Sequence, residues 1–199
     1  GYFIAGGMLK SLDLIALIIG GFLVVAASNG FNQIIEKDLD KLMKRTEDRP
    51  LPQQRVTTFQ AMSLSLAMGL VGVYFLFSIN FYSGFFGSLS VLLYVLAYTP
   101  LKRISSFSVF VGAFPGAIPF MLGWIAVTNH FAIEAGILFA IQFIWQFPHF
   151  WAIAWVSDDD YTKAGFKMLP GNKGKSTAFK ALMYTCLLYT SPSPRDRSI

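Results

Sequence analysis

Residues 12–40 read LDLIALIIGGFLVVAASNGFNQIIEKDLD, an apolar run that passes directly into a cluster of acidic side chains. Residues 12–35 are apolar and long enough to cross a bilayer, which takes about 20 residues of helix. Asn32, Glu36 and Asp40 recur every four residues, so on a helix they lie along one face. The stretch therefore predicts a membrane-spanning helix with a polar stripe at its carboxyl end.

This polar stripe has two interpretations. Carboxylates as close in sequence as Glu36, Asp38 and Asp40 repel one another unless a cation lies between them. Carboxylate and amide oxygens are ligands that Mg²⁺ accepts, usually together with substrate phosphates. The alternative is a solvated helix end that carries ordinary surface charge. Spacing alone leaves both interpretations open.

Composition assigns the whole chain to one class. Of its 199 residues, 54% are hydrophobic and 14% are charged, a balance typical of a polytopic membrane protein. The single cysteine, Cys186, excludes a disulfide framework within the chain and a multi-cysteine metal site. We expect an all-α, polytopic transmembrane helical bundle with spans at residues 12–35, 57–79, 82–99, 107–128, 131–156 and 176–190.

The distribution of charge predicts how the bundle is oriented. Residues 36–56, 100–106 and 157–175, together with Lys180, hold 13 of the 16 Lys and Arg residues. The short turns near residues 80 and 130 hold none. Alternating spans put the three long connections on one side, and the positive-inside rule makes that side cytoplasmic. Most acidic residues lie there too, and ionisable groups at a membrane boundary are candidates for function.

Basic residues follow the polar stripe closely. Lys41, Lys44, Arg45 and Arg49 come directly after Asp40, and the forked guanidinium group of Arg binds phosphate oxygens in a bidentate manner. A loop that mixes acids and bases suits a metal-bridged diphosphate better than a bare cation. The alternative is a basic cytoplasmic loop with incidental acids.

A second acidic cluster closes the 131–156 span, where residues 158–161 read DDDY. Carboxylates at the carboxyl end of a helix oppose the helix dipole, so a metal or a diphosphate is a candidate to hold them. A helix that simply ends in solvent is the alternative. In the YTPLKR segment, Lys102 and Arg103 are either topology anchors or clamps for phosphate or carboxylate.

The WQFPHFW segment lies inside a predicted span. Pro148 frees a backbone carbonyl there and favours a kink. His149 is a candidate to bind metal, relay protons or contact a polar substrate. The alternative is a buried histidine that is hydrogen-bonded by a neighbouring helix.

Four stretches together resemble a known family. In chain order they are NQIIEKDLDKLMKRTEDRPL (32–51), YTPLKR (98–103), GAFPGAIPFMLGW (112–124) and WQFPHFWAIAWVSDDDYTKAGFKMLP (145–170). They resemble the UbiA-type intramembrane prenyltransferases, and within them the branch that farnesylates protoheme IX.

The resemblance implies a nine-span bundle around a central cavity, of which this chain would carry about six spans. Its active-site loops would be cytoplasmic, in a bacterial inner membrane. The implied substrates are farnesyl diphosphate and protoheme IX, the implied cofactor is Mg²⁺, and no nucleic acid is involved. Farnesyl transfer to a vinyl group of protoheme IX would give heme O, with heme A synthase or a terminal oxidase assembly partner as candidate partners.

Carried over position by position, the resemblance also implies the site residues. The implied metal ligands are Asn32, Glu36, Asp38, Asp40, Asp159 and Asp160. Those implied to be catalytic are Asn32, Asp40, Asp159 and Asp160. The implied substrate-binding residues are Arg45, Arg49, Lys102, Arg103, His149 and Tyr161. Glu36 stands where many relatives have Asp, so we expect its carboxylate to be displaced by one methylene.

We expect residues 1–186 to form one prenyltransferase domain that is truncated at both ends and incomplete as an enzyme. Residues 187–199 are expected to be a non-native tail, because two prolines and several charges interrupt an apolar helix there. Two other functions stay open. One is a prenyltransferase that acts on a quinone-type aromatic acceptor, and the other is a membrane cation transporter, which would need ionisable groups along a path at mid-membrane.

Overall fold

The computed structural model describes residues 1–9, 11–171 and 174–189, and this part of the chain contains helices, turns and loops but no strand. The predicted all-α class is confirmed. The predicted tail, residues 187–199, lies outside the described residues from residue 190 onward. The elements are α1 (Leu12–Asp40), α2 (Thr58–Ile79), α3 (Phe81–Leu92), the π-helix η1 (Leu93–Tyr98), α4 (Thr99–Leu101), α5 (Ser108–Thr128), α6 (Ile133–Val156), α7 (Asp158–Lys163) and α8 (Lys175–Tyr189).

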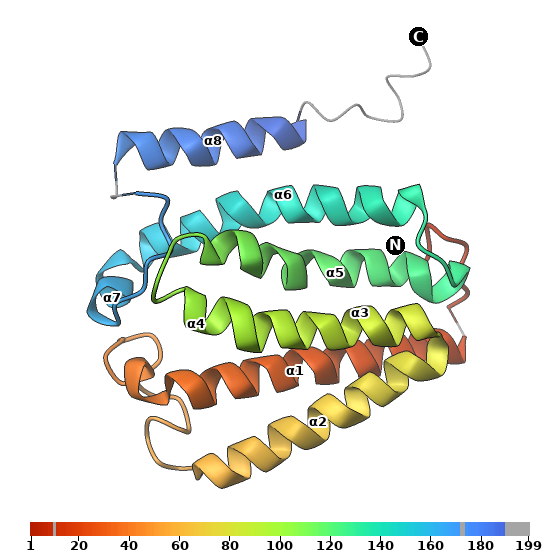
Figure 1. The fold of residues 1–199 in the computed structure, drawn as a ribbon, viewed down its shortest axis with the longest axis horizontal. Helices are drawn as coiled ribbons and strands as arrows, with labels where there is room; N and C mark the ends of the chain where they lie inside the picture. Colours follow the sequence, from red (N-terminus) through yellow and green to blue (C-terminus); the bar gives the residue numbers. More distant parts are fainter. Residues whose placement is uncertain (10, 172–173, 190–199) are drawn as a thin grey trace.

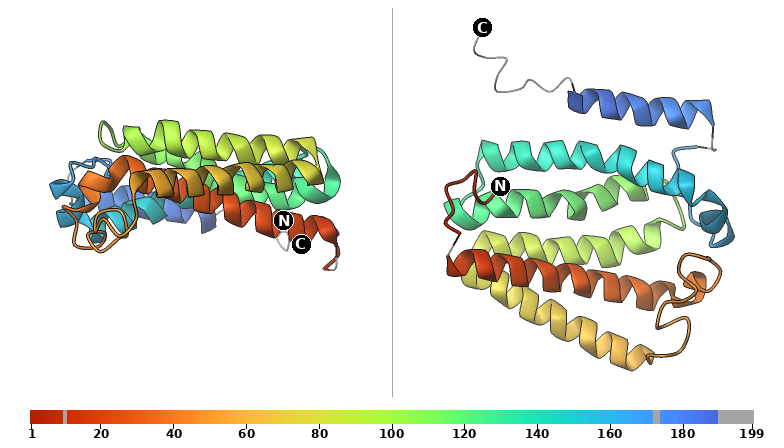
Figure 2. Two further views of the ribbon diagram at one scale, coloured as in Figure 1. Left: turned by 90° about the horizontal axis from the view of Figure 1, so that it is seen from below. Right: turned by 180° about the vertical axis from the view of Figure 1, so that it is seen from behind.

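Seen face-on, the long helices of this thin layer follow the order α2, α1, α3, α5, α6 and α8 (Figure 1), and α2 packs against α3 as well as against α1. Seen edge-on, the layer is much thinner than it is wide (Figure 2). The loop after α1, the connection between α4 and α5, and α7 all lie at the same end of the layer (Figure 1). The three long connections that carry most of the basic residues are thus at one end, as their predicted common side requires.

Five helical segments are long and apolar enough to cross a membrane: Leu12–Asp40, Thr58–Ile79, Phe81–Leu101, Ser108–Thr128 and Ile133–Val156. They match the first five predicted spans. The sixth, residues 176–190, coincides with α8, whose described part has 15 residues. At a rise of about 1.5 Å per residue it is roughly 22 Å long, shorter than the ~30 Å hydrocarbon core.

Polar side chains define where two of these helices begin. The Thr57 hydroxyl accepts a hydrogen bond from the Gln60 backbone N–H, and the Gln60 side chain accepts one from the Thr57 backbone N–H. This capping box satisfies two donors that the first turn of α2 would otherwise leave unpaired. At α3 the Asn80 side chain accepts from Ser83 N–H and donates to the Ile125 carbonyl of α5. The turn at residue 80 is thereby fixed to a neighbouring helix.

The predicted span 82–99 is not one uniform α-helix. Its α-helical hydrogen bonding ends at Leu92, and residues 93–98 continue as a π-helix. The Thr99 backbone N–H consequently bonds to the Tyr94 carbonyl, five residues earlier. Such π-turns often occur at functional sites, because they shift the residues that follow around the helix axis. By contrast, α6 continues through Pro148 as one α-helix.

Candidate active site

A polar pocket of about 160 Å³ lies at the end of the layer where α1 and η1 meet the loops. Helix α1 supplies amide and carboxylate groups, the loop after α1 and the residue after α4 supply cations, and η1 and α7 supply phenol rings. The lining polar side chains are those of Asn29, Asn32, Glu36, Asp40, Arg45, Thr46, Arg49, Tyr94, Tyr98, Lys102 and Tyr161.

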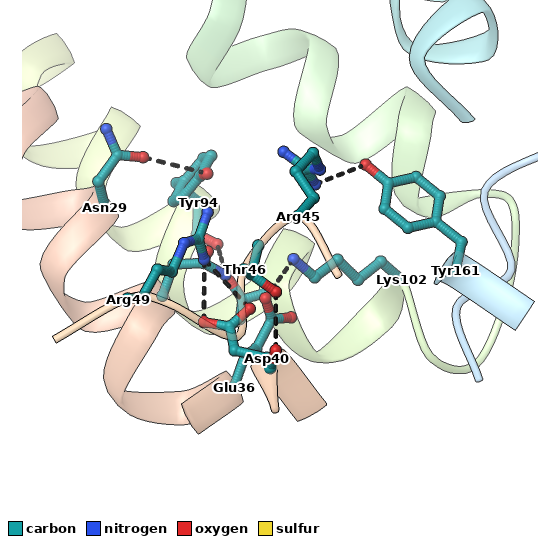
Figure 3. Close-up of polar contacts among 11 residues, drawn as sticks. Asn29, Glu36, Asp40, Arg45, Thr46, Arg49, Tyr94, Lys102 and Tyr161 are labelled. Atoms are coloured by element: carbon teal, nitrogen blue, oxygen red, sulfur yellow. Dashed lines mark hydrogen bonds and ion pairs between the residues drawn. The ribbon is translucent and has the colours of Figure 1, made fainter. Parts of the chain in front are cut away.

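Each carboxylate of the polar stripe is paired with a cation from elsewhere in the chain (Figure 3). Lys102 Nζ lies 2.6 Å from Glu36 Oε2, and both side chains are buried. Arg49 Nη1 donates to both oxygens of Asp40, at 2.9 and 3.1 Å. These pairs relieve the repulsion expected between two carboxylates one helical turn apart.

The loop after α1 connects the two acidic segments. Its backbone N–H at Arg45 donates to Asp160 Oδ2 at 3.3 Å. The Arg45 guanidinium donates to the Tyr161 hydroxyl at the same distance (Figure 3). The Thr46 hydroxyl donates to the Asp40 carbonyl oxygen at 2.9 Å and so closes the loop over the end of α1. Burial raises the pKa of Tyr161 although Arg45 opposes the shift, so the phenol keeps its proton at neutral pH.

Lys102 is held from several sides. Its ammonium lies 4.8 Å from the ring centroid of Phe166 and 5.5 Å from that of Tyr98, distances at which ring faces attract cations. The Lys167 backbone N–H donates to the Lys102 carbonyl at 2.7 Å. Burial lowers the pKa of Lys102, and the neighbouring Glu36 opposes this. These contacts fix the position of the Lys102 side chain inside the pocket.

A second polar chain joins α1 to η1. Asn32 Nδ2 donates to Thr99 Oγ1 at 3.3 Å, and the Thr99 hydroxyl donates to the Tyr94 carbonyl oxygen at 2.8 Å. The Tyr94 hydroxyl in turn donates to Asn29 Oδ1 at 3.4 Å. Two amides of α1 are therefore held by the π-helical segment.

Several predicted site residues are not brought to this pocket. Asp38 is two residues after Glu36, about 200° around the helix; its side chain is 73% exposed and pairs with Lys41 at 3.0 Å. The expectation that Asp38 supports a shared metal site is not met by this geometry. Asp159 is exposed and does not line the pocket.

Arg103 and His149 also lie elsewhere. Arg103 is exposed and is not part of the polar pocket's lining; it lines a neighbouring hollow with Ile35, Pro100 and Glu36, and Glu36 lines both. The ring of His149 is exposed and stacks on Trp145, with centroids 4.5 Å apart.

Comparison with known proteins agrees with the family resemblance of the sequence motifs. Residues 1–194 match the UbiA prenyltransferase family. The chain belongs to this family. A relative from Flavobacterium psychrophilum, named protoheme IX farnesyltransferase, is 55% identical over 176 residues, which are 88% of this chain and 59% of the relative.

Two further relatives with the same name come from Christiangramia forsetii and Cytophaga hutchinsonii. They are 52% and 50% identical, and the matches cover 94% of this chain in both cases but 62% and 68% of the relatives. The chain thus spans about three fifths of the first relatives it matches. No solved structure matches it.

UbiA-family prenyltransferases act on prenyl diphosphates, so the pocket of this member can be tested for a fit to Mg²⁺. Within the part of the chain that the structure describes, no three His, Cys, Asp or Glu side chains converge as a metal site. Mg²⁺ needs only one or two carboxylates when substrate phosphates complete its shell. Glu36, Asp40 and Asn32 line one pocket, and Glu36 Oε1 is buried without a hydrogen-bond partner. These residues fit a cation shared with a phosphate.

Sequence reasoning missed four of the polar residues that line this UbiA-family pocket: Asn29, Thr46, Tyr94 and Tyr98. Asn29 precedes Asn32 by three positions and Tyr98 precedes Lys102 by four, so helical spacing could have placed both beside residues already singled out. Thr99 lies outside the lining and reaches the pocket through its hydrogen bond with Asn32, a partner that nothing in the sequence reveals. Thr46 faces Asp40 because of loop geometry, which has no periodic signal.

Proposed function

We propose that this chain belongs to an enzyme that transfers the farnesyl group of farnesyl diphosphate to a vinyl group of protoheme IX, giving heme O. The observation that carries the proposal is the polar pocket, where two carboxylates and three cations lie together in a UbiA-family chain. The names of relatives that are 50–55% identical support protoheme IX as the acceptor.

The cations of the pocket suit the leaving group. Arg45, Arg49 and Lys102 would donate to diphosphate oxygens and stabilise the negative charge that develops as the carbon–oxygen bond breaks. Mg²⁺, held by Glu36 and Asp40 with Asn32, would supply further charge neutralisation when bound. The bonding electron pair leaves with the diphosphate, and an allylic cation remains.

The rings of the pocket suit that cation. Tyr94 and Tyr98 lie 5.2 Å apart, centroid to centroid, and both line the pocket; their faces would stabilise an allylic cation by cation–π attraction. The π-electron pair of the vinyl group then forms the new carbon–carbon bond. Water adds to the other vinyl carbon and loses a proton, which completes the hydroxyethylfarnesyl group.

The acceptor is expected along α6. Phe150 lies 5.8 Å from Tyr98, and His149 lies 5.9 Å from Phe150 and stacks on Trp145, all as centroid distances. A continuous set of rings therefore leads from the polar pocket to His149. We propose that the flat macrocycle lies on these rings, with His149 as a polar contact.

The second acidic segment has a separate role in this proposal. Asp160 and Tyr161 hold the loop that carries Arg45 and Arg49, while Asp159 would act only after a movement that brings it to the diphosphate. We further propose that the loop end faces the cytoplasm of a bacterial inner membrane, because the basic connections gather there. Heme A synthase or oxidase assembly as the next user of heme O rests on the resemblance alone.

The test uses cells that lack their own heme O synthase and express the full-length protein, followed by heme extraction and mass analysis. Wild type is expected to produce hydroxyethylfarnesyl heme. Asp40→Asn should reduce the product about 100-fold or more, because it removes charge that holds the diphosphate and its cation.

The matched control is Asp38→Asn on the same helix, which removes an exposed carboxylate and should leave the product unchanged. Unmodified protoheme from a folded wild-type protein would overturn the acceptor assignment and favour a quinone-type acceptor. Equal products from the two variants would overturn the role of the pocket. Cation transport is less favoured, because the pocket's acids, Glu36 and Asp40, lie in the last two turns of α1 and are paired with cations rather than spread along a path at mid-membrane.

A further inference from the structure

Thr99 occupies a fully buried position where η1 passes into α4. Its hydroxyl has two neighbours. It donates to the Tyr94 carbonyl oxygen at 2.8 Å and accepts from Asn32 Nδ2 at 3.3 Å. Thr99 thus lies between the backbone of the π-helix and a side chain of the polar pocket.

The proton count at Thr99 fixes the direction of both hydrogen bonds. A threonine hydroxyl has one proton to donate. A backbone carbonyl can only accept, so the proton is committed to Tyr94 and the hydroxyl can offer only a lone pair to Asn32. The amide of Asn32 therefore has to present its NH₂ group to Thr99. Its carbonyl oxygen is then turned away, and because Asn32 is otherwise buried and lines the pocket, that oxygen is left for the pocket.

We propose that Thr99 is a positioning residue that turns the Asn32 carbonyl oxygen into the polar pocket. The inference rests on the proposed function, since it concerns how that site receives a cation and a diphosphate. An oxygen at this place attracts Mg²⁺, whereas an NH₂ group there repels it. The π-turn supports this orientation of the Thr99 hydroxyl, because it brings the Tyr94 carbonyl within reach of Thr99, five residues later.

The variant Thr99→Val keeps the shape of the side chain and removes the hydroxyl. Both orientations of the Asn32 amide become available, and binding that needs the oxygen should weaken. Thr99→Ser keeps the hydroxyl and should behave like wild type. The matched control is Thr128→Val, the same substitution at the far end of α5, where the hydroxyl donates to the Trp124 carbonyl.

The experiment measures equilibrium binding of a non-reacting thiolo analogue of farnesyl diphosphate to full-length protein in nanodiscs at a series of Mg²⁺ concentrations. Thr99→Val is expected to raise the Mg²⁺ concentration needed for half-maximal binding about tenfold, a loss on the scale of one or two hydrogen bonds. Thr99→Ser and Thr128→Val should stay within about twofold of wild type. A wild-type value for Thr99→Val, or a serine variant as weak as the valine variant, overturns the proposal.

A double-mutant cycle keeps the test valid if Thr99→Val also lowers stability. If Thr99 acts through Asn32, the valine substitution has no further effect on Mg²⁺ dependence in an Asn32→Ala background. An equal effect in both backgrounds overturns the proposal. Failure of the proposed function is seen separately, because wild type could bind the analogue with Mg²⁺ and with this Thr99 dependence and still form no heme O.

Discussion

At Glu36 and Lys102, two opposite charges lie 2.6 Å apart with side chains that are 3% and 9% exposed. Breaking a buried ion pair from one side leaves the other charge without a partner and costs about 3–5 kcal/mol. Replacing both partners removes that penalty. We therefore expect the loss of one partner to destabilise the protein more than the replacement of both.

We predict that Lys102→Met lowers the free energy of unfolding by about 3 kcal/mol and that adding Glu36→Gln restores most of it. The measurement is reversible unfolding in mixed micelles with rising SDS. Lys41→Met is the control, since its pairing with Asp38 is exposed and contributes little. Strictly additive losses in the double variant would contradict the prediction.

Individual site residues were predictable as far as local spacing determines them. Asn32, Glu36 and Asp40 share a face because helical periodicity is set within one element. The partner of Glu36 is 66 residues away, and only tertiary packing brings it near. Asp38 was grouped with the others by proximity in sequence, although the same periodicity turns it away from them.

At the scale of elements, hydropathy predicted the existence and rough bounds of five spans but not their internal hydrogen bonding. Residues 82–99 have the composition of a continuous span. Composition does not distinguish a π-helix, with hydrogen bonds between residues five apart, from an α-helix, with hydrogen bonds between residues four apart. The register change at η1 nevertheless decides where Tyr94 and Thr99 lie. The part of the site that depends on this register was accordingly missed.

The crossing of α1 and α2 depends on a glycine. A Cβ atom added at Gly72 would lie 2.9 Å from both the Val24 nitrogen and the Leu23 Cβ, too close for the helices to keep their separation. At Gly69, on the same helix, an added Cβ would lie 3.5 Å from the Ala27 Cβ, which is an ordinary contact.

We predict that Gly72→Ala destabilises the protein by about 1–3 kcal/mol through forced separation of the helices. Gly69→Ala should be neutral or stabilise it by up to about 1 kcal/mol, because alanine favours helix. SDS unfolding of the two variants checks this. Equal effects would show that close approach at residue 72 is not what limits packing.

At the scale of the molecule, the sequence predicted an all-α membrane bundle with its basic connections on one side, and the structure gathers those connections at one end (Figures 1 and 2). Short turns predicted which consecutive helices are neighbours. They did not predict that α3 lies between α1 and α5, because contacts between non-consecutive helices depend on side-chain fit across the whole layer.

The segregation of charge predicts the orientation of the layer in the membrane. Lys44 lies in the basic loop at one end, and His130 lies in the turn between α5 and α6 at the other. Both are exposed, so a cysteine at either position is open to a reagent on its own side.

In a Cys186→Ser background, His130→Cys is expected to react with a membrane-impermeant maleimide in intact spheroplasts, and Lys44→Cys only after lysis. We expect the basic end to face the cytoplasm because the positive-inside rule acts on short loops rich in Lys and Arg. Labelling of Lys44→Cys in intact spheroplasts with protection of His130→Cys would reverse the orientation and place the diphosphate pocket on the side away from the cytosol.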